Sequence, residues 1–379
     1  MAPIRVGIIG LRAGYVDKGI MGNLGHWAFI GHLRSIQAMP GDYEIVAVCN
    51  STVESAQKAI DGYGLPAKAY GGPDDIAKDP RVELVVVAVN VEKHFELAKP
   101  AIENKKDVFV EWPLGATLKQ SEELTRMAAS AGVKTMVGVQ ARADPMVVKL
   151  KEILASGKIG RVVSTSVVIN SSFAPMDAWV EGAEYYLGIE SGGNEYSIGF
   201  GHFLDTFVHV LGDFADLQAM LKTNVTSLPV MNAKGEVVNP SHAKTSPDHA
   251  FVQGTLESGA MASIAVRKSQ AAVDGVGFRW FITGTEGEVG IVTGETMWQF
   301  ADPKRTLRLK VGKNEVEEIE FLAKEDELEA KVPFPGTNSA RQYQGFAKGD
   351  TETCATFESA LKTHRLLDGI LVSAGWKSV

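Results

Sequence analysis

The sequence predicts an α/β protein in which an N-terminal doubly wound parallel sheet is followed by an α+β domain with a large, mostly antiparallel open sheet. Two observations favour this fold class. Over residues 1–140, short β-branched apolar runs alternate with longer helical stretches, which is the pattern of βαβ units. After Gln140 the pattern changes to β-branched strands separated by turn signals, such as Lys234-Gly235 and Glu286-Gly287.

The strands expected in residues 1–140 are continuously apolar rather than alternating, as in parallel strands that are covered on both faces. They are Arg5–Ile9, Glu44–Cys49, Leu84–Val89, Val108–Val110 and Thr135–Gly138, with a weaker one at Lys68–Tyr70. The stretches between them with helical periodicity are Ser51–Tyr63, Lys93–Asn104 and Lys119–Ala131. This alternation indicates one sheet with helices on both of its faces.

The remainder of the chain is expected to form a second domain, residues 141–379. Pro145–Ser156 is an amphipathic helix that ends at Gly157. From Gly160 to Phe321 we expect strands, interrupted by one helix near Ile198–Leu211. The tail Thr356–Lys377 is helical again, and packing back on the first domain is one arrangement open to it.

Composition limits the classes of function. The formal net charge of −8 argues against a sequence-independent nucleic-acid binder, which needs a basic face. The two cysteines, Cys49 and Cys354, are far apart, so we expect neither a disulfide framework nor a thiolate metal site. His242 and His249 have no carboxylates at ligand spacing, and we expect no metal. No signal peptide or membrane span is indicated, so we expect a cytoplasmic location, with the nucleus as a second option.

A glycine-rich turn follows the first strand. Val6–Gly10 leads into Gly14, and Gly19, Gly22 and Gly25 come before a helix that begins near His26. Glycine is needed where backbone must approach a pyrophosphate at a helix N-terminus. Compared with G-x-G-x-x-G, this turn is longer by about ten residues. A glycine-rich loop without a ligand is the alternative, but the βαβ repeats favour a Rossmann domain that binds NAD or NADP.

Asn50 stands at the end of the second strand, where an acidic residue would favour NAD and a basic residue NADP. Asparagine favours neither NAD nor NADP, so the choice between the two cofactors stays open. Asn50 and Ser51 can also cap the following helix.

Several segments together resemble one family over nearly the whole chain. They are Val89–His94, Glu111–Leu114, Gln140–Arg142 with Pro145, Gly157–Gly160, Gly192-Gly193, His202-x-x-Asp205 and Phe357–Leu367. They are similar to the family of glucose–fructose oxidoreductase, inositol dehydrogenase and MocA. This resemblance implies a nicotinamide cofactor and a catalytic histidine at His202.

Within that family, one branch is most similar: the fungal repressors of galactose genes and related oxidoreductase-like proteins. The segments that carry this similarity are Gly25–Ala28, Phe109–Trp112, Pro247–His249 and Gln253–Leu256. The branch binds a nicotinamide dinucleotide but acts mainly in regulation.

Two positions depart from the family pattern. Trp112 stands where the family has a lysine, and Ile198 where it has an aspartate. In the standard enzymes, the resemblance implies, the lysine helps to hold and polarise the reacting hydroxyl. An apolar indole cannot do this, so the usual sugar-dehydrogenase mechanism cannot be transferred unchanged.

The catalytic candidates are grouped around His202, whose imidazole titrates near neutral pH as a general acid or base requires. Asp205 follows three residues later on the same helical face and can orient it. Tyr186 is a candidate substitute for the missing lysine, provided that its surroundings lower its pKa. Trp112 is expected beside the nicotinamide or the substrate.

The binding candidates form two sets, each with core packing as its alternative. The cofactor set is Gly10, Leu11, Arg12, Trp27, Asn50, Val89, Asn90, His94, Glu111, Trp112 and Gln140. The substrate set is Arg142, Trp179, Tyr185, Glu195 and His202.

Two functions of different class fit these residues. The first is an NAD(P)-dependent oxidoreductase that acts on a sugar, polyol or related alcohol or carbonyl compound, with a small-molecule substrate. The second is a dinucleotide-binding transcriptional co-regulator without turnover, whose partner would be a peptide or transcription factor. In either case we expect a homodimer or higher homo-oligomer that forms through the open sheet.

Overall fold

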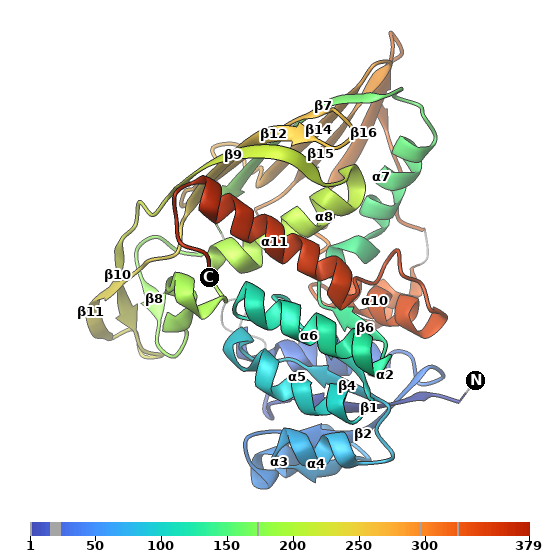
Figure 1. Ribbon diagram of the computed structural model, residues 1–379, viewed down its shortest axis with the longest axis vertical. Helices are drawn as coiled ribbons and strands as arrows, with labels where there is room; N and C mark the ends of the chain where they lie inside the picture. The colour runs from blue at the N-terminus through green and yellow to red at the C-terminus, as the bar shows by residue number, and fades with distance from the viewer. Residues whose placement is uncertain (1, 16–23, 173, 296, 324–325) are drawn as a thin grey trace. The chain divides into compact units, whose positions relative to one another are not determined.

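The structure is a computed structural model that describes residues 2–15, 24–172, 174–295, 297–323 and 326–379. The chain divides into two compact units (Figure 1). The first unit is Met1–Ala143 with Glu325–Lys362, and the second is Asp144–Lys324 with Thr363–Val379. The division falls after Ala143, and the segment Glu325–Lys362, expected in the second domain, groups with the first unit instead.

A six-stranded sheet forms the centre of the first unit. Its strand order is β3-β2-β1-β4-β5-β6, and every neighbouring pair is parallel. The strands are β1 (Ile4–Ile9), β2 (Tyr43–Cys49), β3 (Lys68–Tyr70), β4 (Leu84–Val87), β5 (Asp107–Val110) and β6 (Thr135–Val137). This doubly wound order confirms the predicted Rossmann sheet. Val89 and Gly138, expected inside strands, lie just beyond the ends of β4 and β6.

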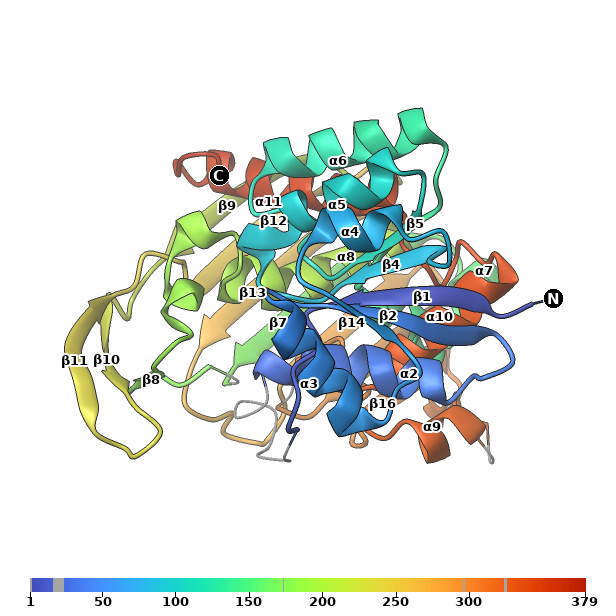
Figure 2. The same cartoon turned by 90° about the horizontal axis from the view of Figure 1, so that it is seen from below.

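Helices cover both faces of this sheet, with α4, α5 and α6 on one side and α2 and α3 on the other (Figure 2). They are a π-helix, Ala28–Leu33, that continues into α2 (Arg34–Gln37), then α3 (Val53–Tyr63), α4 (Pro73–Lys78), α5 (His94–Glu103) and α6 (Leu118–Ala131). The N-cap of α3 is Thr52, whose hydroxyl accepts a hydrogen bond from the Ser55 amide at 3.1 Å. The expected cap at Asn50 and Ser51 is therefore wrong, and Asn50 has another role.

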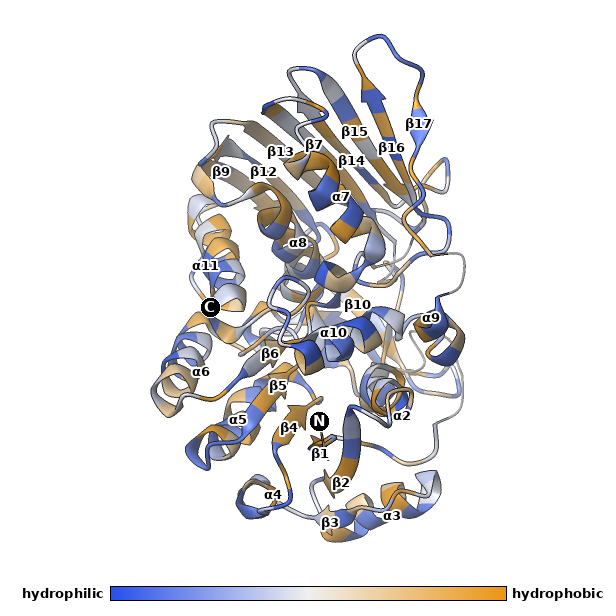
Figure 3. Cartoon of the chain, turned by 90° about the vertical axis from the view of Figure 1, so that its right-hand side faces the viewer, coloured by the Kyte–Doolittle hydropathy of each residue, from blue (hydrophilic) through white to orange (hydrophobic). Residues whose placement is uncertain are grey.

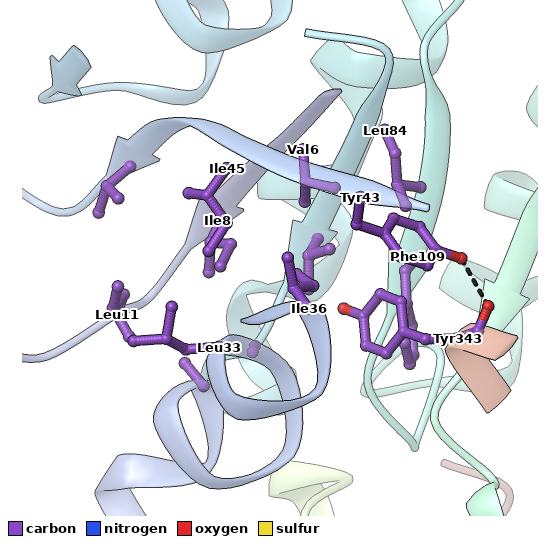
Figure 4. Packing of buried hydrophobic residues seen from close by; sticks show 14 of the residues in the cluster. Val6, Ile8, Leu11, Leu33, Ile36, Tyr43, Ile45, Leu84, Phe109 and Tyr343 are labelled. Atoms are coloured by element: carbon purple, nitrogen blue, oxygen red, sulfur yellow. Dashed lines mark hydrogen bonds between the residues drawn. The ribbon is translucent and has the colours of Figure 1, made fainter. Parts of the chain in front are cut away.

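The core of the first unit is completed by a segment that lies about 200 residues further along the chain. Tyr343 comes from α10 (Thr337–Lys348), which follows the short α9 (Glu327–Lys331). The Tyr43 hydroxyl donates to the Tyr343 carbonyl at 2.6 Å, and the Phe109 and Tyr343 rings lie 5.2 Å apart (Figure 4). The sequence of α10 is polar overall, which is why periodicity did not predict this helix.

The same segment covers the β6 edge of the sheet. Ala355 forms an antiparallel bridge with Val137, and the Gln342 side-chain amide donates to the Val137 carbonyl at 3.1 Å. The Val137 backbone at this edge is therefore paired within the chain, which opposes its pairing with another chain. The helix α11 (Phe357–Ser373) begins in this unit and from Thr363 onward belongs to the second.

The second unit contains an eight-stranded sheet in the order β17-β16-β15-β14-β7-β13-β12-β9. All neighbouring pairs are antiparallel except β7 and β13, which confirms the predicted mostly antiparallel sheet. The strands are β7 (Val162–Ser171), β9 (Phe214–Lys222), β12 (His249–Leu256), β13 (Met261–Lys268), β14 (Phe278–Gly284), β15 (Gly287–Thr293), β16 (Thr306–Val311) and β17 (Glu317–Glu318). A separate small sheet consists of β8 (Trp179–Val180), β10 (Ser227–Met231) and β11 (Val237–Ala243).

Hydropathy distinguishes the two large sheets (Figure 3). Strand β4 is apolar along its length and β5 from Val108 onward, whereas β16 alternates between hydrophilic and hydrophobic residues. Alternation is typical of a sheet with one covered and one open face. The covered face packs on α8 (Gly201–Leu211), where Phe203 contacts Trp280 and Trp298 with ring centroids 5.4 and 5.3 Å away.

Two more helical elements belong to the second unit. The predicted helix at Pro145–Ser156 is confirmed as α7 (Pro145–Ala155). A π-helix, Glu195–Phe200, runs directly into α8, so the helix predicted near Ile198–Leu211 begins slightly earlier than expected. Among the helices of the described ranges, none is long and apolar enough to cross a membrane.

Candidate functional site

The turn after β1 requires glycine at its first position. Gly10 has φ +103°, and its amide donates to the Cys49 carbonyl at 3.0 Å. A Cβ on Gly10 would lie 2.4 Å from the Ala88 carbonyl oxygen and 2.6 Å from a Val89 methyl carbon. The turn therefore lies directly against the chain that leaves β4, and only a residue without a side chain fits. Such a turn leaves backbone exposed for close approach by a phosphate group.

The glycines further along the turn have different environments. Gly19 and Gly22 lie outside the described residues. A Cβ on Gly25 would lie 2.8 Å from an Arg12 guanidinium nitrogen, and one on Gly31 would lie 2.8 Å from the Trp27 indole. Arg12 and Trp27 were both predicted to contact the cofactor. Their side chains lie directly against Gly25 and Gly31, on the side of the turn where the helix begins.

Asn50 connects the turns after β1 and β2. Its side-chain nitrogen donates to the Leu11 carbonyl at 2.8 Å and to the Ser55 carbonyl at 3.2 Å. Leu11 itself is fully buried. Asn50 is therefore a structural link at the position where a ribose-binding carboxylate would otherwise stand.

Three aromatic rings that the sequence analysis did not select lie beside the glycine turn. Tyr15 stacks on Phe29 at 4.5 Å, Phe29 stacks on Tyr63 at 5.0 Å, and the Arg34 guanidinium lies 4.8 Å from the Phe29 ring centre. The Tyr63 hydroxyl donates to the Arg12 carbonyl at 2.8 Å, which fixes this stack to the turn. No spacing in the sequence reveals it, because its members come from three separate segments.

His94 joins the loop after β4 to the loop after β5. Its ring nitrogens lie 2.8 Å from the Pro113 carbonyl and 3.0 Å from the Val89 carbonyl. Burial lowers the pKa of His94, and the nearby carbonyl oxygens only partly oppose this effect. Its ring holds Val89 and the cis Trp112–Pro113 peptide in place, while Asn90 beside them is exposed.

Glu111, predicted at the nicotinamide ribose, lies at the carboxyl end of β5 and is buried. Its carboxylate covers Gly138, where a Cβ would lie 2.4 Å from a carboxylate oxygen. The His32 ring lies 2.9 Å from the other carboxylate oxygen, an ion-pair distance without hydrogen-bond geometry, and its second nitrogen lies 2.8 Å from the Tyr343 hydroxyl. His32 and Tyr343 were missed because each looks like an ordinary core residue in its own segment.

Three more candidates lie after β5 and β6. Trp112 and Arg142 are buried, and Arg142 donates to the Ser359 hydroxyl at 3.2 Å. Gln140 is also buried, and its side-chain oxygen has no hydrogen-bond partner among the described residues. An unpaired buried acceptor is costly unless a ligand or water completes it.

The first unit thus presents the ends of five parallel strands at one edge. Gly10 follows β1, Asn50 follows β2, Val89 follows β4, Glu111 follows β5 and Gln140 follows β6. Open α/β sheets bind ligands beyond the carboxyl ends of their strands. Two features of this edge fit a dinucleotide. There is no room for a side chain at Gly10 in the turn, and the Gln140 oxygen has no partner among the described residues.

In the second unit, Glu195 is paired with a lysine that the sequence analysis did not select. The Lys268 ammonium lies 2.7 Å from one Glu195 oxygen, and the Ser171 hydroxyl donates to the same oxygen. Trp179 stacks on Tyr186 at 5.2 Å, and its indole N–H donates to the Ala183 carbonyl at 2.7 Å.

The lowered pKa that Tyr186 would need in order to replace the lysine is not found. Burial raises the pKa of Tyr186 well above 10, and the negative charge of Glu195 and the neighbouring Tyr185 raise it further. Tyr186 is therefore a neutral phenol near pH 7 and a poor replacement for the missing lysine as a titrating proton donor.

His202 and Asp205 lie near the start of α8, and both are buried. The Thr363 hydroxyl donates to Asp205 at 3.1 Å, which fixes the carboxylate. Thr206 accepts from the Trp298 indole at 2.9 Å and donates to the His202 carbonyl at 3.3 Å. Ile198, at the position of the family's aspartate, is half-buried in the preceding π-helix.

Within the described ranges, no group of three or more His, Cys, Asp or Glu side chains could hold a metal ion.

A parallel doubly wound sheet with a glycine turn at its ligand-binding edge defines a dinucleotide-binding protein of the Rossmann class. Comparison with known families agrees. The model of the oxidoreductase family with an NAD-binding Rossmann fold, GFO_IDH_MocA, matches residues 4–139, and that of the Gal80p C-terminal domain matches residues 145–293. The chain belongs to this oxidoreductase family and carries a second domain of the Gal80p type.

Individual relatives fall into two groups. Dehydrogenase aclE of Aspergillus oryzae is 32% identical over 377 residues, which cover 98% of this chain and 96% of that protein. The galactose/lactose metabolism regulatory protein GAL80 of Kluyveromyces lactis is 30% identical over 266 residues, 68% of this chain and 56% of that protein. The matched sequence therefore spans nearly all of the dehydrogenase but little more than half of the regulator.

Solved structures show the same fold. A super-repressor mutant of Gal80p from Saccharomyces cerevisiae has a TM-score of 0.84 at 23% identity and covers 99% of this chain and 96% of its own. Levoglucosan dehydrogenase in complex with NADH and levoglucosan has a TM-score of 0.72 at 19% identity and covers 98% of this chain and 97% of its own.

The first prediction concerns the glycine turn. Gly10→Ala should weaken binding of NADH or NADPH about 100-fold, because the new methyl group displaces the Ala88 loop and positive φ adds about 1–3 kcal/mol of strain. Gly14→Ala is the matched control, since Gly14 also has positive φ (+75°) but, apart from its chain neighbours, no atom of the described residues lies within 4 Å of its Cβ position. Fluorescence titration measures both. Equal losses in the two variants would contradict a steric role for Gly10.

The second prediction concerns His94 and pH. The pKa of His94 in the folded protein lies below the ordinary 6.5. As the pH falls, the unfolded chain therefore binds a proton at His94 before the folded chain does. The free energy of unfolding should therefore fall as the pH drops below about 6.5. Urea denaturation from about pH 7.5 to 5.5 measures this slope. His94→Asn should be less stable at pH 7.5 and show a smaller slope; an unchanged slope would exclude His94 as its source.

Proposed function

We propose that this protein is an NAD(P)-dependent oxidoreductase that acts on a sugar, polyol or related alcohol or carbonyl compound. The observation that carries the proposal is a complete dinucleotide-binding edge in a chain that also retains a buried histidine, His202, on α8. Full-length similarity to dehydrogenase aclE supports a dehydrogenase more than a pure regulator.

Each group of residues has a defined task in this proposal. The Gly10 turn and the N-terminus of the following helix hold the pyrophosphate. Glu111, held between His32 and Gly138, accepts from the nicotinamide ribose, and the Gln140 oxygen accepts from the carboxamide or an ordered water. The bound dinucleotide supplies the hydride acceptor or donor.

His202 handles the proton. On oxidation of an alcohol, its imidazole takes the hydroxyl proton as the carbon loses hydride; on reduction it returns that proton to the carbonyl oxygen. Asp205, fixed by Thr363, lies three residues further on the same helix and orients the imidazole. This assignment requires no titration of Tyr186, in agreement with its raised pKa.

Trp112 changes the chemistry of the position where the family has lysine. Its indole is buried and apolar, so it excludes water and packs against a ring but cannot polarise a hydroxyl. The polarisation of the substrate oxygen then falls on His202 and on polar groups of the second unit.

The second candidate function is a dinucleotide-binding transcriptional co-regulator without turnover, with a peptide or transcription-factor partner. Two observations favour it: the GAL80 relatives, and the replacement of the family's lysine by Trp112. The two functions differ in what they require of His202, since a regulator needs only the bound dinucleotide and a partner surface.

The third prediction tests the function. The purified protein should bind NAD(H) or NADP(H), and nicotinamide absorbance should change with at least one member of a sugar and polyol panel. His202→Asn should lower kcat/KM by about 10²- to 10⁴-fold and leave the Kd of NADH unchanged. Binding of dinucleotide without turnover across the panel would favour the regulator, and absence of binding would contradict both functions.

The fourth prediction concerns assembly, for which we propose a homodimer through the open face of the large sheet. Met220 and Phe251 are paired across β9 and β12, and they are 68% and 40% exposed. Large apolar side chains on an open sheet face mark an interaction surface. Phe251→Glu should therefore yield monomers in sedimentation velocity, whereas Val273→Glu, at a residue that is 99% exposed, should not. A monomeric wild-type protein would contradict the dimer.

A further inference from the structure

Lys268 is a buried cation that the proposed chemistry has not yet used. It is the last residue of β13, and its side chain is 2% exposed. It follows Ala262, Ile264 and Val266 on the covered face of the sheet, where apolar side chains are the rule. Its ammonium group has three N–H donors, and the described residues accept only one of them, through Glu195.

The two carboxylate oxygens of Glu195 differ in their hydrogen bonds. One carboxylate oxygen accepts from both Lys268 and Ser171. The other oxygen is buried and has no hydrogen-bond partner among the described residues. A buried carboxylate oxygen normally accepts at least one hydrogen bond, so this one points to a donor that the protein itself does not supply.

Tyr186 adds a third group of the same kind. The Tyr186 side chain is buried, no described residue forms a hydrogen bond with its hydroxyl, and the Glu195 charge is close enough to raise its pKa. The Tyr186 ring stacks on Trp179 with an interplanar angle of 17°, and the bond from the Trp179 indole to Ala183 fixes this pair. A flat aromatic surface therefore lies beside an unused acceptor and unused donors.

A purely structural ion pair explains this arrangement poorly. Isolated buried pairs stabilise proteins little, and apolar residues of similar size often replace them without loss. A pair retained for stability would also satisfy both carboxylate oxygens, whereas here one oxygen has two donors and the other has none. This asymmetry is typical of a site that a ligand completes.

We propose that Glu195, Lys268 and Tyr186 recognise two neighbouring hydroxyl groups of a neutral polyol or sugar. The free Glu195 oxygen accepts from one hydroxyl, and Lys268 donates to the oxygen of the next. The Trp179–Tyr186 stack contacts the apolar C–H face of the same molecule. Lys268 thus supplies, from the second unit, a cation that binds substrate hydroxyl groups although Trp112 has replaced the family's lysine.

The charge of the site selects among polyhydroxylated compounds. Glu195 and Lys268 together are neutral, so a neutral diol adds no net charge to a buried site. A sugar acid or sugar phosphate would bring a second negative charge beside Glu195, which is unfavourable in a medium of low dielectric constant. We therefore expect neutral polyols to bind and their carboxylate or phosphate derivatives to be rejected.

This proposal rests on the proposed oxidoreductase function for its substrate but is tested separately by binding. Tryptophan fluorescence of the full chain with NADH bound is titrated with myo-inositol, D-glucose and D-galactose. The variants are Lys268→Met and Glu195→Gln, and Lys158→Met is the matched control on an exposed lysine. The two site variants should weaken binding of the best polyol about 100-fold and leave the Kd of NADH unchanged.

Turnover separates the two proposals. One outcome is that the wild type binds a polyol without oxidising it, while the variants lose this binding. That result supports the polyol site and contradicts the proposed oxidoreductase function. If the wild type turns over a polyol, KM should rise about 100-fold in the variants, with kcat changed less. Unchanged polyol affinity in variants that retain their circular dichroism and NADH binding would overturn the site, as would a wild type that binds none of the three polyols.

Experiments on the wild type keep the proposal testable if a variant does not fold. Single-deoxy derivatives of D-glucose should include at least two neighbouring positions whose loss weakens binding about 100-fold. D-Gluconate and D-glucose 6-phosphate should bind more weakly than D-glucose by a similar factor. Equal affinity for all deoxy derivatives, or preference for the anionic compounds, would exclude recognition of a neutral diol.

Discussion

The contact between Gly10 and the Ala88 carbonyl is the constraint on which the first unit depends. A side chain at residue 10 would overlap this oxygen, so β1 and β4 can lie side by side, with their loops closely packed, only when residue 10 is glycine. The same edge then gathers the residues that follow β2, β5 and β6. His94 fixes the loops after β4 and β5, and Asn50 fixes those after β1 and β2.

The second unit follows a different physical rule. Its large sheet is covered on one face by α8, and the aromatic rings of Phe203, Trp280 and Trp298 fill that interface. Within this apolar layer, Lys268 and Glu195 form a buried charged pair near the Trp179–Tyr186 stack. Buried charges need specific partners, and each member of this pair supplies one to the other.

Sequence reasoning predicted the strands of the first sheet because continuous apolar runs reflect burial on two faces. For the second sheet it predicted only a region of strands between Gly160 and Phe321, from β-branched residues and turn signals. It missed α10, whose polar sequence hides a buried helix, and it missed His32, Tyr343 and Lys268. Each of these three acts through a partner from a distant segment, and neither spacing nor composition can show such a pairing. Whether Tyr186 meets the condition of a lowered pKa was also beyond the sequence, since the burial and the Glu195 charge that raise this pKa come from the folded environment.

The sequence by itself determined the parallel sheet, the glycine turn at its edge and the family to which the chain belongs, because these depend on local patterns and short motifs. Only the tertiary structure decided that residues 325–362 complete the first unit, that Asn50 links two turns, and that Lys268 pairs with Glu195. The physical reason is that hydrogen bonds and ion pairs act over a few ångströms in space, between residues whose separation along the chain carries no signal.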